Sequence, residues 1–436
     1  MPLIWMLILL SSPAIADTIS GESLPTPGGK WTRNIQPTGS LIAPAQHLDD
    51  QQELAFWTGF SFFRNPWIAS PASTTARDGL GPLFNAHSCE ACHPGGGRGH
   101  TLLGKTEQGN GTVIRIGVLS EEGVLSEHPY YGHQLQTRST YSATAEAEIT
   151  LHEEDVGKLR KPVIDIEWGE AGPADDAHLS IRVAPALIGL GLLESIPVSV
   201  LQEMEDPNDK DGDGISGRIH WWKDQGEQKP GLFGWKARHT SVHNQNGSAF
   251  RDDIGITNVG FEAQPCTAQQ KQCLRAPSGN DEEVGVEIVP ELFDYVTFFT
   301  RHIPPPAAGK LTEFVERGRN KFSEIGCDGC HRPSYATSEG RFWPYTDLLL
   351  HDMGEELAEA VPEGDASGSE WRTPPLWGIG TMKRVAGHTT LLHDGRARSV
   401  NEAILWHGGE AAMSKEKYEA LSVEDRRAVI RFINAL

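Results

Sequence analysis

Cysteine and histidine occur together twice in this chain of 436 residues, each time as Cys-x-x-Cys-His. The residues are Cys89, Cys92 and His93 in the first copy, and Cys327, Cys330 and His331 in the second. Two thiols at this spacing can add to the vinyl groups of a haem, and the histidine beside them can bind the iron. A thioredoxin-type site would need a strand before a helix, and structural zinc would need two more ligands nearby. Neither context accompanies the two copies, so the pattern predicts two covalently attached c-type haems.

The N-terminus indicates where such chemistry would take place. An apolar run covers residues 3–10, and the small residues Ala14-Ile15-Ala16 follow it. This order is typical of a secretory signal peptide, which we predict at residues 1–16, with Asp17 as the first residue of the mature chain. A membrane anchor is the alternative, but the run is shorter than the roughly 20 residues that span a bilayer. We therefore expect an exported, periplasmic protein.

The remaining two cysteines, Cys266 and Cys273, have no histidine after them. In an exported protein two neighbouring thiols usually form a disulfide, so we expect a local disulfide here. A redox-active dithiol is the alternative.

The composition favours a packed protein with an acidic surface. Hydrophobic residues make up 38% of the chain, and its length leaves room for two or three cores. With 59 acidic and 38 basic side chains, the formal net charge is −21. This charge argues against a nucleic-acid partner and favours a basic protein partner. Beyond the N-terminus no segment is long and apolar enough to span a membrane, so we expect no span in the mature chain.

A second repeat follows each haem motif. The segments "PALIGLG" at 185–191 and "PPLWGIG" at 374–380 share a proline, a leucine and both glycines, and an arginine precedes each. Two motifs followed by the same segment indicate duplication of one haem-binding unit, with coincidence in a Gly- and Pro-rich chain as the alternative. Near the C-terminus, Ser422 can cap an amphipathic helix like the closing helix of a small cytochrome c domain.

These features predict a mainly α fold, with little β structure and with long loops around short helices. We expect two cytochrome c-like haem domains, at residues 17–300 and 301–436. The first domain would contain a long insert, because its haem motif and its Pro-Leu-Gly repeat are much further apart than those of the second.

Several longer segments resemble a known family. They are "GLGPLFNAHSCEACH", "RVAPALIGLGLLESIP", "DKDGDGISGR", "FGWKA", "YTDLLLHDMG", "WRTPPLWGIG" and "LLHDGRARSVNEAILWHGGEA". Together they span roughly residues 79–411. They resemble the dihaem cytochrome c peroxidase superfamily, and most closely its branch of dihaem oxidoreductases, once labelled thiol oxidoreductases.

The resemblance implies two haems that exchange electrons. A small donor protein, such as a cytochrome c or a cupredoxin, would reduce the haem of His331. Electrons would then pass to the haem of His93, where hydrogen peroxide or a related oxidant is reduced. Two other functions remain open: a purely electron-transferring dihaem cytochrome, and a maturation-type oxidase that acts on a protein partner.

The resemblance also implies a second ligand for the second haem. In the related peroxidases this ligand precedes a Gly-Gly pair, and His407 occupies that place here. Relatives have Met or Tyr at this point, so His407 would produce a bis-His haem of lower potential. A histidine that only ends a helix is the alternative. The rival ligands are Met382, His388 and His393.

Peroxide chemistry would need further side chains near the first iron. Some of the peroxidases have a histidine before the Arg-Pro segment that binds the iron in a resting form, and His178 occupies that neighbourhood. Arg182 could stabilise negative charge on bound peroxide or pair with a haem propionate. Splitting peroxide also needs a proton shuttle, for which Glu194 is the candidate. An exposed histidine and a solvated glutamate at a helix end are the alternatives for His178 and Glu194.

Residues 206–217 form the densest acidic segment. Asp209, Asp211 and Asp213 occupy positions one, three and five of a calcium loop of the EF-hand type, and Ile215 can offer a backbone carbonyl. Position twelve is His220, where such loops have glutamate. Five carboxylates this close together would otherwise repel, so we predict a calcium ion here, with an exposed acidic loop as the alternative. The related peroxidases also bind calcium, between their domains.

Overall fold

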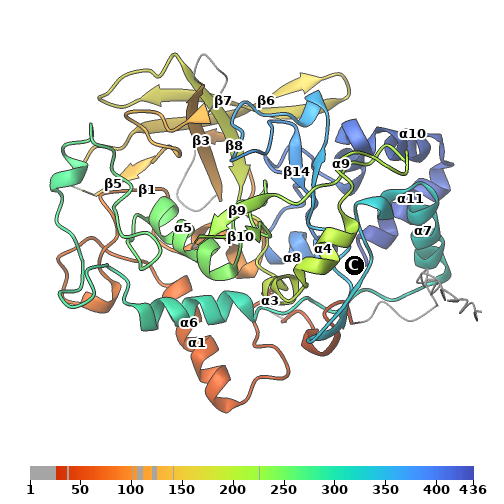
Figure 1. Ribbon diagram of the computed structural model, residues 1–436, viewed down its shortest axis with the longest axis horizontal. Helices are drawn as coiled ribbons and strands as arrows, with labels where there is room; N and C mark the ends of the chain where they lie inside the picture. Colours follow the sequence, from red (N-terminus) through yellow and green to blue (C-terminus); the bar gives the residue numbers. More distant parts are fainter. Residues whose placement is uncertain are drawn as a thin grey trace, which may run out of the picture.

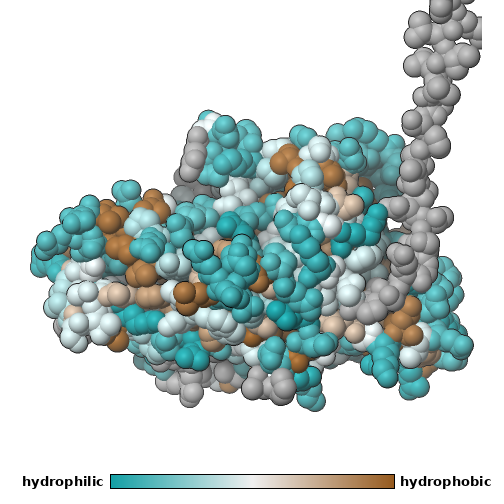
Figure 2. Space-filling model, turned by 90° about the horizontal axis from the view of Figure 1, so that it is seen from below, coloured by the Kyte–Doolittle hydropathy of each residue, from teal (hydrophilic) through white to brown (hydrophobic). Residues whose placement is uncertain are grey.

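The structure is a computed structural model (Figure 1). It describes residues 26–36, 39–101, 103–105, 111–119, 125–140, 142–224 and 226–436. The signal peptide predicted at residues 1–16 lies outside them. Within the described part, no helix combines the length and the apolar character that crossing a membrane requires. Figure 2 shows one face of the molecule, on which hydrophilic side chains predominate and apolar ones form small groups.

The first haem motif forms the short helix α2 (Cys89–Cys92), and three longer helices pack around it. They are α1 (Asp50–Arg64), α5 (Val242–Ile254) and α6 (Pro290–Arg301). A capping box of Asp49 and Gln52 begins α1. This helix lies along α6, because Gly59 leaves room for the backbone of Tyr295. The interface is filled by the buried rings of Phe56, Phe63 and Phe299.

A second group of helices surrounds the second haem motif. It consists of α7 (Glu313–Glu324), α9 (Val400–Trp406), α10 (Ala412–Ala420) and α11 (Val423–Ile433), while the 3-10 helix η5 (Cys327–Gly329) holds the motif itself. The side chains of Thr312 and Ser422 cap α7 and α11. Gly318 lets α7 approach the backbone of α11, and Phe322 packs edge-on against Phe432 with ring centres 5.4 Å apart. The helix expected at the C-terminus is present as α11.

Shorter elements connect these two groups. The remaining α-helices are α3 (Leu190–Glu194), α4 (Val198–Met204) and α8 (Met382–Val385). Four antiparallel pairs of short strands are β1 (Leu83–Phe84) with β5 (Arg138–Ser139), β9 (Trp221–Asp224) with β10 (Glu227–Pro230), β11 (Tyr335–Thr337) with β12 (Gly340–Phe342), and β13 (Leu350–Asp352) with β14 (Glu370–Arg372).

The prediction of a mainly α fold with little β structure was wrong, because 31% of the residues are helical and 19% form strands. Two three-stranded antiparallel sheets, ordered β2-β6-β7 and β4-β3-β8, account for much of the difference (Figure 1). Their strands are β2 (Gly104–Lys105), β3 (Thr112–Leu119), β4 (Leu125–Ser126), β6 (Ala147–Val156), β7 (Leu159–Trp168) and β8 (Ala177–Val183). Along β6, Ala147, Ile149 and Leu151 are buried and alternate with more exposed residues. This period of two marks a half-buried strand, and the sequence already contained it.

The two Pro-Leu-Gly repeats pack against each other. Gly189 of the first repeat lies against the ring of Trp377 in the second. In return, a Cβ on Gly378 would come within 2.7 Å of Cδ1 of Ile188. Gly189 and Gly378 hold the same place in the two repeats, and so do Ile188 and Trp377. The contact is therefore reciprocal, which supports duplication of one unit.

Replacing Gly189 by alanine tests this contact. The φ of Gly189 is 69°, and a methyl group there would overlap the ring of Trp377. Gly157 has a similar φ of 63° with open space around it, so Gly157→Ala is the control. It should lower the free energy of unfolding by about 1 kcal/mol, the cost of a left-handed backbone alone. Overpacking should cost Gly189→Ala about 1–3 kcal/mol more, measured as the free energy of unfolding in urea. Equal losses in the two variants would show that the repeats are not in close contact.

Candidate functional site

Both haem motifs line one cavity. The motif residues on its wall are Cys89, Cys92, His93, Cys327, Cys330 and His331. Apolar side chains, among them Phe63, Leu193, Leu376 and Ile404, form much of the remaining wall. Two motifs that are far apart in the sequence therefore meet at a single, largely apolar site.

The first motif is held by backbone hydrogen bonds. Ser88 caps the short helix α2 by accepting from the amide of Ala91, and the amide of His93 donates to the carbonyl of Cys89 at 3.0 Å. Nδ1 of His93 donates to the carbonyl oxygen of Pro185 at 2.8 Å, and Nε2 forms no hydrogen bond with the described residues. Burial lowers the pKa of His93 to about 4, so the imidazole is neutral, the form that binds metals.

The second motif repeats this arrangement. Gly326 begins η5 with a φ of 86°, and the amide of His331 donates to the carbonyl of Cys327. Nδ1 of His331 donates to the carbonyl oxygen of Tyr345 at 2.9 Å, and burial lowers the pKa of this imidazole to about 4. Within the described residues, Nε2 of His331 thus also has no hydrogen-bond partner, and the imidazole is uncharged at neutral pH.

Burial also acts on the cysteines of both motifs. It raises the pKa of Cys89, Cys92 and Cys327 to about 12, and it raises the pKa of Cys330 as well. A redox-active dithiol needs an accessible thiolate, which these surroundings disfavour. The four sulfur atoms suit uncharged thioethers, the form that covalent haem attachment produces.

His407 lies on the same cavity wall, at the C-terminal end of α9. Its Nδ1 donates to the carbonyl of Ala403 at 2.6 Å, which leaves Nε2 without a partner within the described part of the chain. Burial lowers the pKa of His407. His407 lies near enough to His331 that a positive charge on it would lower the pKa of His331. Both imidazoles thus line the cavity with Nδ1 bonded to a backbone carbonyl and with a lowered pKa, so both could bind a haem iron through Nε2.

The three rival ligands differ in position. Met382 and His393 also line the cavity, and the ring of His393 stacks on Trp371 with ring centres 3.8 Å apart. His388 is not on the wall, and its Nε2 interacts with the carbonyl of Arg98 at 3.0 Å.

The residues predicted to act on peroxide are not brought together. His178 lies in β8 opposite Gly117 and does not line the cavity. Glu194 is also absent from the wall, because its carboxylate binds Arg301 at 2.6 Å and accepts from the first amide of α5. Arg182 does line the cavity, but it forms a two-point ion pair with the buried carboxylate of Glu359. Its charge is therefore already neutralised.

Asp253 is a cavity residue that sequence reasoning missed. Its side chain lines the wall, accepts from Nε2 of Gln134 at 2.9 Å, and lies near enough to act electrostatically on Cys89 and Cys92. Burial raises the pKa of Asp253 to about 6. A signal was present, because Asp252 and Asp253 occupy the last turn of a helix, where the dipole disfavours carboxylates.

Three carboxylates of the acidic loop converge. Carboxylate oxygens of Asp209, Asp211 and Asp213 lie within 4.8 Å of one another. Asp209 has a φ of 46° and accepts from the amide of Gly214 at 3.1 Å. His220 is turned away, because its Nδ1 bonds the carbonyl of Lys236 at 2.6 Å. The side chain of Ile215 reaches the cavity, so the loop lies beside the second haem motif.

A buried histidine joins this loop to the second motif. Nε2 of His351 lies 2.8 Å from Asp347, and Nδ1 lies 2.6 Å from Glu410. Glu410 also accepts from the amide and the hydroxyl of Ser216, the residue after Ile215. Burial lowers the pKa of His351, but the negative charge of Asp347 and the groups around it raise the pKa by more. The pKa of His351 therefore lies well above its usual value.

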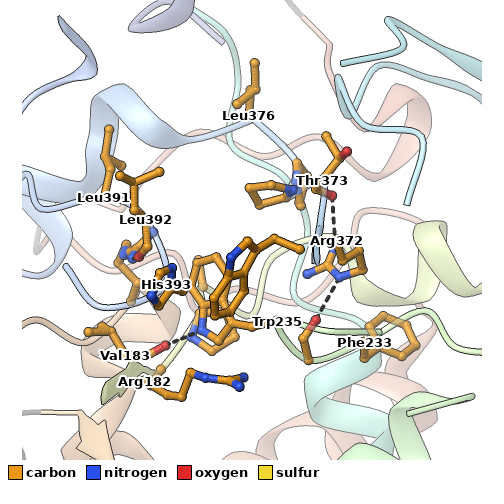
Figure 3. Close-up of a pocket in the computed structure, with 18 of the residues that line it drawn as sticks. Arg182, Val183, Phe233, Trp235, Arg372, Thr373, Leu376, Leu391, Leu392 and His393 are labelled. Carbon is orange, nitrogen blue, oxygen red and sulfur yellow. Dashed lines mark hydrogen bonds between the residues drawn. The ribbon is translucent and has the colours of Figure 1, made fainter. Parts of the chain in front are cut away.

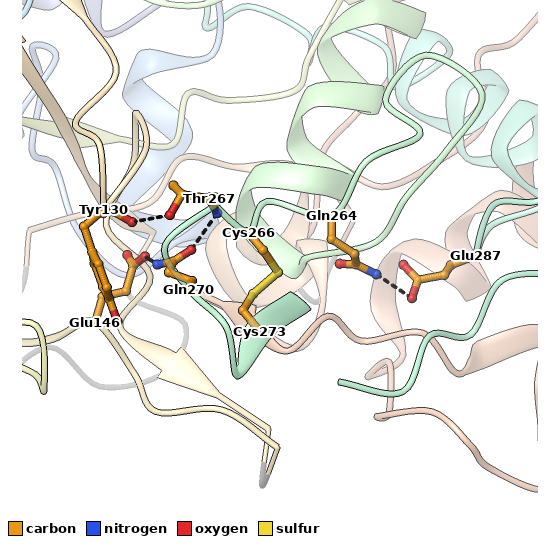
Figure 4. Close-up of a disulfide and its surroundings, with 8 residues drawn as sticks. All are labelled: Tyr130, Glu146, Gln264, Cys266, Thr267, Gln270, Cys273 and Glu287. Atoms are coloured by element: carbon orange, nitrogen blue, oxygen red, sulfur yellow. Dashed lines mark hydrogen bonds between the residues drawn. A yellow bond between two sulfur atoms is a disulfide. The ribbon is translucent and has the colours of Figure 1, made fainter. Parts of the chain in front are cut away.

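Cys266 and Cys273 are joined by a disulfide away from the cavity (Figure 4). The loop between them places Gln270 against the buried carboxyl of Glu146, and Thr267 donates to the carbonyl of Tyr130 at 2.9 Å. Burial raises the pKa of Glu146 to about 8. The disulfide thus fixes a loop that covers a buried polar group.

The cavity fits a haem group on several counts. Imidazoles with a free Nε2, cysteines in apolar surroundings and apolar walls match the iron, the vinyl groups and the porphyrin faces. Haem also carries two propionates, and the wall offers the buried guanidinium groups of Arg98 and Arg372, neither of which forms an ion pair within the described residues.

Comparison with known proteins gives the family. Residues 108–436 match the family described as "Di-haem oxidoreductase, putative peroxidase". The chain belongs to this family, which confirms the predicted resemblance to the dihaem oxidoreductase branch. Membership indicates an oxidoreductase, and the family name implies haem cofactors. The matched region contains the second motif and both repeats, and it begins after the first motif. No curated protein and no solved structure matches the chain.

The His351 cluster predicts a pH-dependent stability. The pKa of His351 in the folded protein lies above its unfolded value of about 6.5, so protonation of His351 stabilises the fold. This stabilisation is complete below about pH 6.5 and is lost as the pH rises through the folded pKa. His351→Gln breaks a buried ion pair, so it should cost about 3–5 kcal/mol near pH 6 and progressively less toward pH 9. Thermal unfolding of both proteins across this range measures the difference.

The matched control is His152→Gln, which removes a half-exposed histidine that lies 3.1 Å from Asp165. Exposed pairs contribute about 0–1 kcal/mol, so this variant should stay close to the wild type at every pH. A loss in His351→Gln that does not change with pH would show that His351 is not charged in the folded protein.

Proposed function

We propose that this chain is an exported dihaem c-type oxidoreductase that reduces hydrogen peroxide or a related oxidant. The observation that carries the proposal is the single cavity lined by both motifs, in which His93 and His331 each keep Nε2 free. Electrons would enter at the haem of His331 and pass to the haem of His93. The net charge of −21 supports a basic donor protein, such as a small cytochrome c or cupredoxin, in the periplasm.

The two sides of the cavity suit different roles. The bound haems would supply one-electron redox chemistry. His331 and His407 would both bind the iron of the second haem, which suits electron transfer. His178 is not on the wall, which supports a first haem that keeps one position for the oxidant. The resting ligand that the resemblance suggested for His178 has no support in this arrangement.

Asp253 is the better candidate for proton transfer. Reduction of hydrogen peroxide to two water molecules consumes two electrons and two protons. A carboxyl group with a pKa of about 6 can hold a proton and release it near neutral pH. Asp253 lies on the wall near the first motif, whereas the carboxylate of Glu194 is held by Arg301 away from it.

Spectra recorded with and without hydrogen peroxide test this function. The absorption of one haem should change on mixing, and the reduced protein should turn over peroxide. Asp253→Asn should lower kcat by about 10²–10⁴-fold, the usual contribution of a proton-transferring group. Glu194→Gln is the control and should keep the wild-type kcat. Wild-type haems that are inert to peroxide would contradict a peroxidase and favour the purely electron-transferring cytochrome.

His407 gives a separate prediction. Two imidazoles favour ferric iron more than an imidazole with a thioether does, so His407→Met should raise the midpoint potential of one haem only. It should also introduce the near-infrared band of methionine-ligated ferric haem. His407→Gly should open that iron to added imidazole. His388→Met is the control, because His388 is off the cavity wall. Wild-type spectra and potentials in both His407 variants would exclude it as a ligand.

The acidic loop gives a prediction about calcium. If Asp209, Asp211 and Asp213 bind calcium, saturation at 100 times the Kd should stabilise the protein by about 2.7 kcal/mol. Chelation should remove this gain, and Asp211→Asn should abolish the response in thermal unfolding. Asp155→Asn, which changes an exposed carboxylate in β6, should keep it. Identical unfolding of chelated and calcium-loaded wild type would leave only an acidic surface loop.

A further inference from the structure

Five arginines line the cavity, and three of them have carboxylate partners. Arg182 is paired with Glu359. Arg115 and Arg238 each lie 3.9 Å from the carboxylate of Glu363. The charges of these three side chains are therefore at least partly balanced by protein groups.

Arg98 and Arg372 form no such ion pair. Asp394 and Asp347 act on them only from beyond ion-pair distance, and these carboxylates pair with Arg396 and His351. Arg98 is 9% exposed and donates to the carbonyl of Leu392 at 2.6 Å, while its Nε is buried without a hydrogen bond. Arg372 is 6% exposed and donates only to the carbonyls of Gly234 and Thr373, at 2.9 and 3.1 Å (Figure 3). Across the described ranges, no carboxylate forms an ion pair with either guanidinium.

This imbalance points to a missing anion. Burying a cation without a counterion is costly, and carbonyl oxygens balance only part of the charge. Burial lowers the pKa of both arginines to about 10, which still leaves them charged at neutral pH. A planar guanidinium binds a carboxylate through two parallel hydrogen bonds, and both arginines keep N–H groups free on the cavity wall.

Both arginines contact Trp235, which Figure 3 shows together with Arg372. The guanidinium of Arg98 lies 5.5 Å from the centre of the indole ring, and the amide of Arg372 donates to the carbonyl of Trp235 at 2.9 Å. The indole Nε1 donates to the carbonyl of Val183 at 2.7 Å, two residues before the carbonyl that holds His93. Trp235 is thus tied to the segment that orients the first motif.

Arg372 belongs to the surroundings of the second motif. Its Nη1 and the hydroxyl of Thr346 donate to the same carbonyl, that of Thr373. Thr346 follows Tyr345, whose carbonyl holds His331. Arg98, in contrast, follows His93 by five residues in the first motif segment. Each guanidinium is therefore attached to a different haem site.

We propose that Arg98 and Arg372 are carboxylate-binding residues, one for a propionate of each haem. Arg98 holds a propionate of the haem bound by His93, and Arg372 holds one of the haem bound by His331. The assignment rests on the proposed dihaem function. It explains why Arg182 is paired with Glu359 while Arg98 and Arg372 form no ion pair within the described residues.

Redox titration of the holoprotein at several pH values tests the proposal. A cation beside a propionate disfavours the ferric state, so Arg98→Gln should lower the midpoint potential of the first haem and leave the second unchanged. Arg372→Gln should do the reverse. In each variant the affected potential should become pH-dependent between about pH 5 and 8, because the propionate loses the charge that keeps it ionised.

Three further proteins make the result unambiguous. Arg98→Lys and Arg372→Lys keep the charge and should retain the wild-type potentials, which separates charge from packing. Arg317→Gln is the matched control, because Arg317 is off the cavity wall and pairs with Glu424 and Asp425, and it should leave the potentials and their pH dependence unchanged. Unchanged potentials in both glutamine variants, or equal shifts of both haems in either one, would overturn the proposal.

The same samples separate this inference from the proposed function. Two haems per chain that are inert to peroxide, together with site-specific shifts in the variants, would support the propionate sites and reject the peroxidase. A wild-type protein with fewer than two haems would overturn the proposed function, and the propionate sites with it.

Discussion

Two hydrogen bonds to backbone carbonyls determine what the cavity can bind. Pro185 and Tyr345 accept from Nδ1 of His93 and His331, at 2.8 and 2.9 Å. Each bond fixes the tautomer and the orientation of a buried imidazole, so that Nε2 is the atom left for a metal. A side chain cannot supply this constraint as rigidly as backbone that is itself packed. The chain conformation around Pro185 and Tyr345 is therefore part of the site.

The packing of the two repeats supports this constraint. The contact between Gly189 and Trp377 holds the segment that begins at Pro185, and its counterpart between Gly378 and Ile188 holds the second repeat. The two repeats are not equivalent in every respect, because His93 bonds the first repeat, whereas His331 bonds a residue well before the second. Duplication thus accounts for the contact, and later divergence accounts for the different surroundings of the two imidazoles.

Local patterns made part of this arrangement predictable. Two Cys-x-x-Cys-His motifs and two repeats could be found in the sequence because covalent haem attachment and close backbone contacts need fixed residue types at short spacing. Asp253 and the pairing of Glu194 with Arg301 could not be found this way, because they depend on which helix ends meet across the fold. The β6–β7 hairpin was different, because the alternating pattern of β6 and the turn residue Gly157 are visible in the sequence. The expectation of a cytochrome c fold nevertheless led to a prediction of little β structure.

Charge balance in the wall distinguishes side chains that serve the fold from those that serve a ligand. Glu194 and Arg182 resembled catalytic groups in the sequence, yet both are neutralised by protein partners. No sequence pattern singles out Asp253 or Arg98. In the part of the chain that the structure describes, however, neither side chain has an oppositely charged group at hydrogen-bonding distance. Pairing depends on tertiary contacts, so it emerges only from the folded chain.

The haem content of the holoprotein is the most direct measurement of the central claim that one cavity holds two covalent haems. Protein made with a c-type haem maturation system should contain two haems per chain by pyridine haemochrome assay, and intact mass should show both attached. A Cys89→Ala, Cys92→Ala double variant should retain one covalent haem, attached through Cys327 and Cys330. One haem in the wild type, or haem that acid acetone extracts, would contradict the claim.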